Sequence, residues 1–136
     1  MDSKSIVLPN DTQEVPQLAA FVDEVCETQG FDPTVTMQMN LAIEEAVVNV
    51  MEYAYPPGTQ GNVNIEVHSD DKQLTFTITD NGIPFDPTGK ADADTTLSAE
   101  ERPIGGLGIL MVRRIMDTVT YERVDGQNVL TLTKTL

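Results

Sequence analysis

Residues 74–82 read LTFTITDNG, and this alternating run with its polar ending decides how the chain folds. An extended strand would place its apolar side chains on one side and its threonines on the other. Asp80 shares the parity of the apolar residues. Its carboxylate is therefore expected on the interior side of the sheet, where it needs a hydrogen-bond donor. The alternative is that the strand has already ended and that Asp80 only caps a turn with Asn81 and Gly82.

The periodicity on either side of this run predicts the other elements. Residues 62–69 alternate in the same way, and the polar turn at 70–72 joins the two strands as a hairpin. The remaining elements are a strand at 5–8, a helix from about 12 to 30, a helix from 32 to about 55, a helix at 108–116 and a strand pair from 119 to 135. This order predicts one domain over residues 1–136 with an α+β fold. It would be a two-layer α/β sandwich, with three main helices on one face of a mixed, mainly antiparallel sheet.

The composition of the chain limits its partners. The 136 residues include 8 Lys and Arg against 22 Asp and Glu, a formal net charge of -14. So acidic a chain repels nucleic acid and membranes with anionic surfaces, and we expect neither as a direct partner, whereas a basic protein surface would be attracted. Cys26 is the only cysteine, the first residues lack the apolar stretch of a signal peptide, and no segment approaches transmembrane length. A cytoplasmic location is therefore expected.

Glu45 and Asn49 form a second polar feature, on the helix expected at 32–55. They are four residues apart and hence share one face of a helix that is otherwise apolar almost all round. A carboxylate beside a carboxamide oxygen suits Mg2+, with Asn49 as a direct ligand and Glu45 binding through water or accepting a proton. The alternative is a polar stripe that faces solvent, with Glu44, Glu45 and Glu52 as ordinary helix formers.

A glycine cluster supplies the third feature. Gly105-Gly106-Leu107-Gly108 precedes the helix at 108–116 and would present free backbone amides at its positive dipole end, as phosphate-binding helix starts do. Glycine clusters are also ordinary turn signals, so this run is a weak indication when taken alone.

The segment from Ile83 to Ile104 loses all periodicity, and a loop of this length in a compact domain is usually functional. Its only cations are Lys90 and Arg102. Either one could contact the γ-phosphate of a nucleotide, although a solvated loop charge is the simpler interpretation, especially for Lys90.

In this order, Glu-x-x-x-Asn at 45–49, Asp-x-Gly at 80–82 and Gly-x-Gly at 106–108 resemble the ATP-binding signature of gyrase-type topoisomerases, heat-shock chaperones, histidine kinases and mismatch-repair ATPases. The match spans nearly the whole chain. Within that superfamily, the short chain and the stretch at 101–108 are similar to the bacterial anti-sigma-factor serine kinases. Members of that family often have His before an Ala-Tyr pair, whereas this chain has Tyr53 there.

The resemblance implies a histidine-kinase-like ATPase fold of the Bergerat type. Its ATP pocket would lie between the helices and the sheet, with the loop at about 83–104 as a lid. By the same resemblance, Glu45 would be the catalytic base that takes a proton from a partner's serine hydroxyl, and Asn49 would be the Mg2+ ligand. Asp80 and Gly82 would hold adenine. The other implied nucleotide contacts are Arg102, Gly106, Leu107 and Gly108.

The implied function is that of an ATP-dependent serine/threonine protein kinase, with ATP and Mg2+ as cofactors. It would phosphorylate an anti-anti-sigma-type partner, sequester a sigma factor and so regulate transcription by partner switching. The Thr-rich outer face of the sheet would meet either solvent or the second copy in a homodimer. Two alternatives stay open: a non-catalytic ATP-gated protein-binding switch, and a detached histidine-kinase catalytic domain whose phosphoacceptor lies on another protein.

Overall fold

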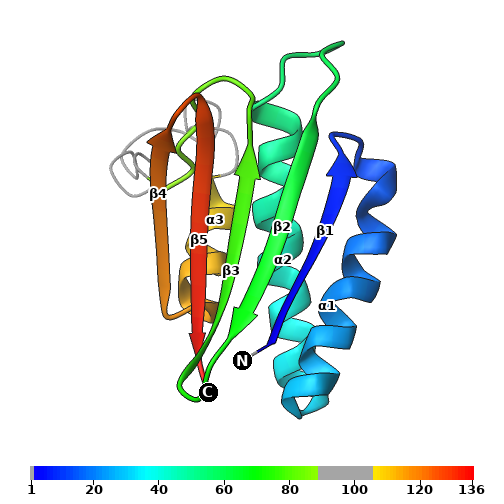
Figure 1. Cartoon of the computed structure of the whole chain (residues 1–136), viewed down its shortest axis with the longest axis vertical. Coiled ribbons are helices and arrows are strands. Elements are labelled where there is room, and N and C mark those ends of the chain that lie inside the picture. Colours follow the sequence, from blue (N-terminus) through cyan, green and yellow to red (C-terminus); the bar gives the residue numbers. More distant parts are fainter. Residues whose placement is uncertain (1, 89–105) are drawn as a thin grey trace.

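The computed structural model describes residues 2–88 and 106–136, which form a five-stranded sheet with three helices on one of its faces (Figure 1). The predicted α+β class, the two layers and the order of the elements are confirmed. The elements are β1 (Asp2–Pro9), the short 3-10 helix η1 (Thr12–Glu14), α1 (Val15–Gln29), α2 (Pro33–Tyr53), β2 (Asn62–Ser69), β3 (Gln73–Asp80), α3 (Gly106–Ile115), β4 (Thr118–Val124) and β5 (Gln127–Thr135).

The sheet has the strand order β1-β2-β3-β5-β4, and each neighbouring pair is antiparallel. The expectation of a mixed sheet is therefore corrected, since no adjacent strands among the described residues run parallel. β4 does run in the same direction as β3, but β5 turns back between them and pairs with both. The turn signal at residues 125–126 predicts this hairpin, yet it does not indicate which of its strands lies inside the sheet.

Local sequence signals set the ends of the first two helices. Gly30 follows α1 with φ 75°, a left-handed conformation that glycine adopts at little steric cost. Asp32 then caps α2, because its side chain accepts a hydrogen bond from the backbone amide of Val35 at 2.9 Å. α2 ends at Tyr53, shortly before the Pro56-Pro57-Gly58 run that cannot continue a helix.

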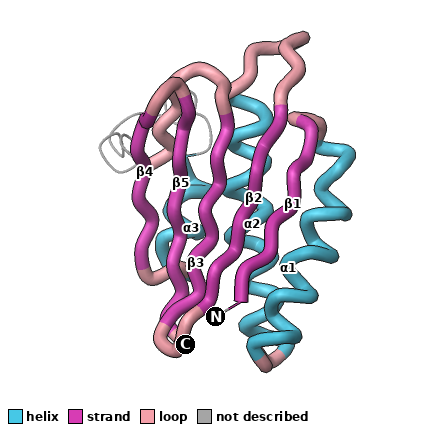
Figure 2. Tube along the Cα trace, in the orientation of Figure 1, coloured by secondary structure: helices cyan, strands magenta, loops and turns pink. Residues whose placement is uncertain are grey.

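α2 lies at the centre of the helical layer, between α1 and α3 (Figure 2). It buries side chains on several of its faces, which confirms that this helix is covered on more than one side. The strands turn alternate apolar side chains toward the helices, while the threonines of β3 and most of those of β5 are half-exposed on the other face. Among the described residues, none of the helices combines the length and apolar character that crossing a membrane requires.

The C-terminal ends of α2 and β3 lie at one end of the molecule, and the first residues of α3 point toward the same end (Figure 1). Tyr55 joins the first two. Its hydroxyl donates to the Asn62 carbonyl at 2.7 Å and accepts from the Asn81 amide at 3.2 Å. Gly61 leaves the space that the Tyr55 ring fills, since a Cβ atom there would lie 2.3 Å from the ring. The segments that carry the first two sequence motifs are therefore in contact, and the start of α3 is directed toward the same end of the molecule (Figure 1).

Candidate functional site

Asp80 closes β3 and is the one charged side chain that the described part of the chain buries, with 2% of its surface exposed. Its Oδ1 atom accepts hydrogen bonds from the Gly82 amide and from Nδ2 of Asn128, both at 2.9 Å. Its Oδ2 atom is also buried, and no described residue donates to it. The predicted inward parity is confirmed. The turn with Gly82 is present as well, so one carboxylate oxygen holds the turn while no described residue binds the other.

The unpartnered Oδ2 atom indicates what a ligand would have to supply. Burial raises the pKa of the Asp80 carboxyl, and the hydrogen bonds from Asn128 and Gly82 oppose this rise only in part. Leaving a buried acceptor without a donor costs about 1–3 kcal/mol of folding free energy, and more for a charged group. A ligand that donates a hydrogen bond to Oδ2 would recover this cost. The exocyclic amine of adenine is such a donor.

Gly82 brings the chain after β3 against the end of α2. A Cβ atom at this position would lie 2.2 Å from the carbonyl oxygen of Ala54, and the Ile83 amide donates to that same oxygen at 2.8 Å. Arg123 of β4 approaches from another segment and donates to the Gly82 carbonyl at 2.9 Å. Close backbone packing is therefore one reason for a glycine here. The close approach of an adenine ring to Gly82 stays a prediction.

Gly82→Ala is expected to lower the free energy of unfolding by about 1–3 kcal/mol, because the backbone of Ala54 cannot move aside as a flexible side chain would. Urea unfolding of the variant and the parent measures the change. Gln60→Ala, at an exposed position of the loop between α2 and β2, is the control and should stay within about 0.5 kcal/mol of the parent. Equal stability of Gly82→Ala and the parent would contradict this account of the glycine.

Glu45 and Asn49 lie one turn apart on α2 and are in contact, since Nδ2 of Asn49 donates to Oε1 of Glu45 at 3.3 Å. Asn49 is 4% exposed, whereas Glu45 is half-buried. Mg2+ takes oxygen ligands, so Oδ1 is the carboxamide atom of Asn49 that could hold the cation while Nδ2 donates to Glu45. Within residues 2–88 and 106–136, no group of three or more His, Cys, Asp and Glu side chains could hold a metal ion. The pair therefore fits a Mg2+ that takes its other ligands from water and nucleotide phosphates.

A contact between Tyr53 and Phe85 joins this pair to Asp80. Tyr53 lies one further turn along α2 from Asn49, and its ring centroid is 5.8 Å from that of Phe85. The Phe85 amide in turn donates to Oδ1 of Asn128 at 3.1 Å, and Asn128 binds Asp80. These contacts thus connect Asp80 to α2, the helix that carries Glu45 and Asn49.

Asn128 is the residue of this set that sequence reasoning missed. It is 3% exposed and faces Asp80 directly across the β3–β5 pair. The sequence does contain a pattern that could have found it. Asn128 has the same parity as Leu130 and Leu132, which places its side chain on the inner face of the sheet. Without the strand order, however, nothing in the sequence indicated that it faces Asp80.

The glycine motif is described only in part. The first residues of α3 are Gly106, Leu107 and Gly108, and backbone amides at a helix start have no intrahelical acceptor. Gly105, Lys90 and Arg102 lie outside the described residues, as does most of the expected lid. The roles predicted for them stay predictions.

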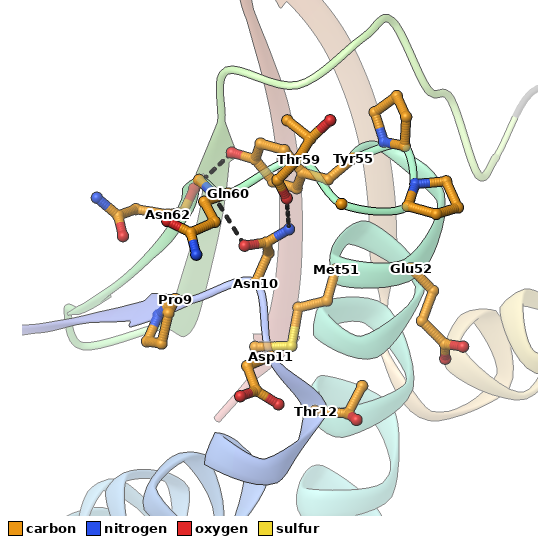
Figure 3. Close-up of a pocket in the computed structure, with 14 residues that line it drawn as sticks. Pro9, Asn10, Asp11, Thr12, Met51, Glu52, Tyr55, Thr59, Gln60 and Asn62 are labelled. Atoms are coloured by element: carbon orange, nitrogen blue, oxygen red, sulfur yellow. Dashed lines mark hydrogen bonds between the residues drawn. The ribbon is translucent and has the colours of Figure 1, made fainter.

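A hollow of about 920 Å³ lies between the turn after β1 and the loop that joins α2 to β2 (Figure 3). Asn10 connects its two sides, since its side chain donates to the Thr59 carbonyl at 2.7 Å and accepts from the Gly61 amide at 2.9 Å. None of the predicted site residues that the structure describes lines it, and its described lining includes Asp11 and Glu52 but no Lys or Arg. An acidic lining without cations repels a triphosphate, so the size of this hollow does not identify the nucleotide site.

The sequence matches one protein family and is similar to proteins named as serine or serine/threonine kinases. A family model described as "Histidine kinase-like ATPase domain" matches residues 8–134. The chain is 30% identical over 95 residues to the serine/threonine-protein kinase BtrW of Bordetella bronchiseptica, covering 70% of this chain and 67% of that protein. It is 26% identical over 133 residues to the serine-protein kinase RsbW of Listeria innocua serovar 6a, covering 95% of this chain and 85% of that protein.

A solved structure has the same fold as this chain. The mycobacterial sensor histidine kinase MprB superposes with a TM-score of 0.56, over 96% of this chain and 97% of that chain. Its sequence identity is 15%, so this likeness concerns the fold alone.

Proposed function

Because the chain belongs to the histidine kinase-like ATPase domain family, we propose that it is an ATP-dependent serine/threonine protein kinase acting on an anti-anti-sigma-type protein. Membership of the family implies ATP binding. The observation that carries the proposal is the buried, unpartnered Oδ2 atom of Asp80, which fits the exocyclic amine of adenine. The similarity to proteins named serine-protein kinases supports the activity. The class of partner rests on the resemblance to anti-sigma kinases.

The proposed pocket contacts ATP at its adenine base and at its phosphates. Asp80 accepts a hydrogen bond from the adenine amine, beside the turn at Gly82. The phosphates extend toward the start of α3, where the free amides of residues 106–108 and the helix dipole stabilise negative charge despite the net charge of -14. When bound, Mg2+ would neutralise phosphate charge from a position on the Asn49 carboxamide oxygen.

Glu45 is the proposed catalytic base. It is half-buried, so a hydroxyl of a second protein can reach it, and the hydrogen bond from Asn49 holds its Oε1 atom. The carboxylate accepts the serine proton while the serine oxygen bonds to the γ-phosphorus and the bond to ADP breaks. The products are a phosphoserine on the partner, ADP and a protonated Glu45, which then loses its proton to water.

Asn49→Leu is expected to remove the contribution of Mg2+ to ATP binding. Leucine keeps the branched shape but offers no oxygen, so affinity in Mg2+ should fall about tenfold or more, whereas affinity in EDTA should not change. Calorimetric titration of ATP under both conditions measures this. Gln38→Ala, exposed on the same helix, should respond to Mg2+ as the parent does. A full Mg2+ response in Asn49→Leu would contradict the role of Asn49.

The proposal is tested by incubating the protein with ATP labelled in the γ-phosphate and with candidate partner proteins. Label on a serine or threonine of one partner is the expected result. Label on a partner's histidine would instead identify a detached histidine-kinase catalytic domain. Sequestration of a sigma factor and a homodimer belong to the same proposal, and the acidic charge favours basic docking surfaces on the partners.

A second candidate is an ATP-gated binding switch without kinase activity. Two contacts between the segment after Asp80 and the end of α2 favour it. The Ile83 amide donates to the Ala54 carbonyl, and the Phe85 ring contacts the Tyr53 ring. A ligand that moved this segment would alter the surface at the end of α2. The discriminating result is ATP binding that changes partner affinity while no protein gains phosphate.

A further inference from the structure

Asn128 uses every hydrogen-bonding position of its carboxamide. Its Nδ2 atom donates to Oδ1 of Asp80 at 2.9 Å and to the carbonyl of Ile83 at 2.8 Å. Its Oδ1 atom accepts from the Phe85 amide at 3.1 Å and from the Tyr121 hydroxyl. Two donors and two lone pairs are the whole capacity of an asparagine side chain. Asn128 therefore has no group left for a ligand, whereas Asp80 has one.

A polar side chain is costly at this place in β5. The next residues of the same parity, Leu130 and Leu132, are 2% and 0% exposed. A leucine at position 128 would continue this apolar row and would bring no polar group that needs a partner. The asparagine instead connects three segments, because its partners lie at the end of β3, in residues 83–85 and on β4.

We propose that Asn128 is a positioning residue that couples recognition of the adenine amine by Asp80 to the placement of residues 83–85. This inference rests on the proposed ATP site. The bonds from Asn128 and Gly82 both go to Oδ1 of Asp80, so they turn the carboxylate to present Oδ2. The Nδ2 atom that holds Oδ1 also holds the Ile83 carbonyl.

The coupling extends from Asp80 to α2. A donor that binds Oδ2 restrains the carboxylate, the carboxylate restrains the Asn128 amide, and the amide restrains the backbone at Phe85. The Phe85 ring contacts Tyr53, one turn beyond Asn49 on α2. Occupation of the base site is thus transmitted to the helix that carries the proposed Mg2+ ligand, without any contact between Asn128 and the nucleotide.

The test compares two nucleotides in Asn128→Leu and the parent. Purine riboside triphosphate differs from ATP only in lacking the 6-amino group. The parent should prefer ATP by about 10–100-fold, as expected for a hydrogen bond to a charged acceptor. In Asn128→Leu the preference should fall to about threefold or less, since only the Gly82 amide then holds the Asp80 carboxylate. A merely structural role would weaken both nucleotides equally and leave the ratio unchanged, which would overturn the proposal.

Val129→Thr is the matched control. Val129 is the next residue on β5, has nearly the shape of threonine, and its side chain lies half-exposed on the opposite face of the sheet. The variant should keep the parent's preference for ATP. Loss of the preference in Val129→Thr as well would overturn the specific role of Asn128.

A second measurement needs no variant, and it decides the question if Asn128→Leu does not fold. Hydrogen exchange of the Phe85 amide is followed in the parent, saturated with either nucleotide. Coupling predicts exchange about tenfold slower with ATP than with the analogue that lacks the amine. Equal exchange rates would overturn the coupling.

The outcomes separate this inference from the proposed function. If the parent binds both nucleotides equally, the adenine assignment of Asp80 fails and the coupling fails with it. If the parent prefers ATP but Asn128→Leu keeps the preference, only the role of Asn128 fails. Neither outcome depends on phosphoryl transfer to a partner.

Discussion

Glu45→Gln is expected to lower the rate of phosphoryl transfer to the partner by about 10²–10⁴-fold, the usual contribution of a general base. Glutamine has the same shape, and its carbonyl oxygen can still accept the hydrogen bond from Asn49. Its amide cannot take the proton of the serine hydroxyl. Affinity for Mg-ATP should therefore stay within about twofold of the parent, because the substituted group acts only in the transfer step.

Transfer from labelled ATP to the partner, at saturating ATP, measures the rate, and calorimetric titration measures the affinity. Glu44→Gln is the matched control, since Glu44 is the adjacent residue and is exposed. It should transfer phosphate as fast as the parent. Transfer by Glu45→Gln at the parent's rate would remove Glu45 from the mechanism.

Asp80→Asn should weaken ATP binding by about 10–100-fold while making the free protein no less stable. The side-chain oxygen of the new asparagine can still accept the hydrogen bonds from Gly82 and Asn128. Its NH2 group then takes the place of Oδ2, and because both this group and the adenine amine are donors, they cannot hydrogen-bond to each other. The free protein exchanges a buried carboxylate oxygen, to which no described residue donates, for a neutral NH2 group that costs less to bury. The affinity for ATP should therefore fall, whereas the free energy of unfolding of the free protein should not.

The dependence of stability on pH follows from the raised pKa of Asp80. Below the ordinary value of 3.8 the carboxyl is protonated in both the folded and the unfolded chain, so it has no net effect. As the pH rises through the interval between 3.8 and the raised folded pKa, the unfolded chain ionises first, and the folded state loses stability. Above that interval, Asp80→Asn should melt at a higher temperature than the parent.

Thermal melts across this pH range and ATP titrations at neutral pH measure both effects. Asp71→Asn, in the exposed turn between β2 and β3, is the control and should match the parent in both. Equal ATP affinity of Asp80→Asn and the parent would refute the adenine assignment.

Strand parity and helix periodicity predicted much of the fold because both are local properties of the chain. Alternation along residues 74–80 was sufficient to place Asp80 on the inner face. The all-round apolar character of α2 was sufficient to place it between other elements. Membership of the histidine kinase-like ATPase family is confirmed, and the similarity to bacterial serine-protein kinases agrees with the resemblance seen in the motifs.

What sequence reasoning missed depends on contacts between distant segments. The pairing of β5 with β3 decides that Asn128 faces Asp80, and no local pattern reports that pairing. The approach of Gly82 to Ala54 likewise depends on how the end of β3 meets the end of α2. The predicted mixture of parallel and antiparallel strands was wrong for the same reason. β5 lies between β3 and β4 and pairs antiparallel with both, and no local sequence pattern reports this strand order.

The most direct test of the account is a crystal structure of the protein with Mg2+ and a non-hydrolysable ATP analogue. The account predicts the adenine amine within hydrogen-bonding distance of Oδ2 of Asp80, Mg2+ on Oδ1 of Asn49, and the phosphates at the start of α3. A nucleotide seated in the hollow lined by Asn10 and Thr59, or an adenine ring that leaves Oδ2 of Asp80 without a donor, would contradict it.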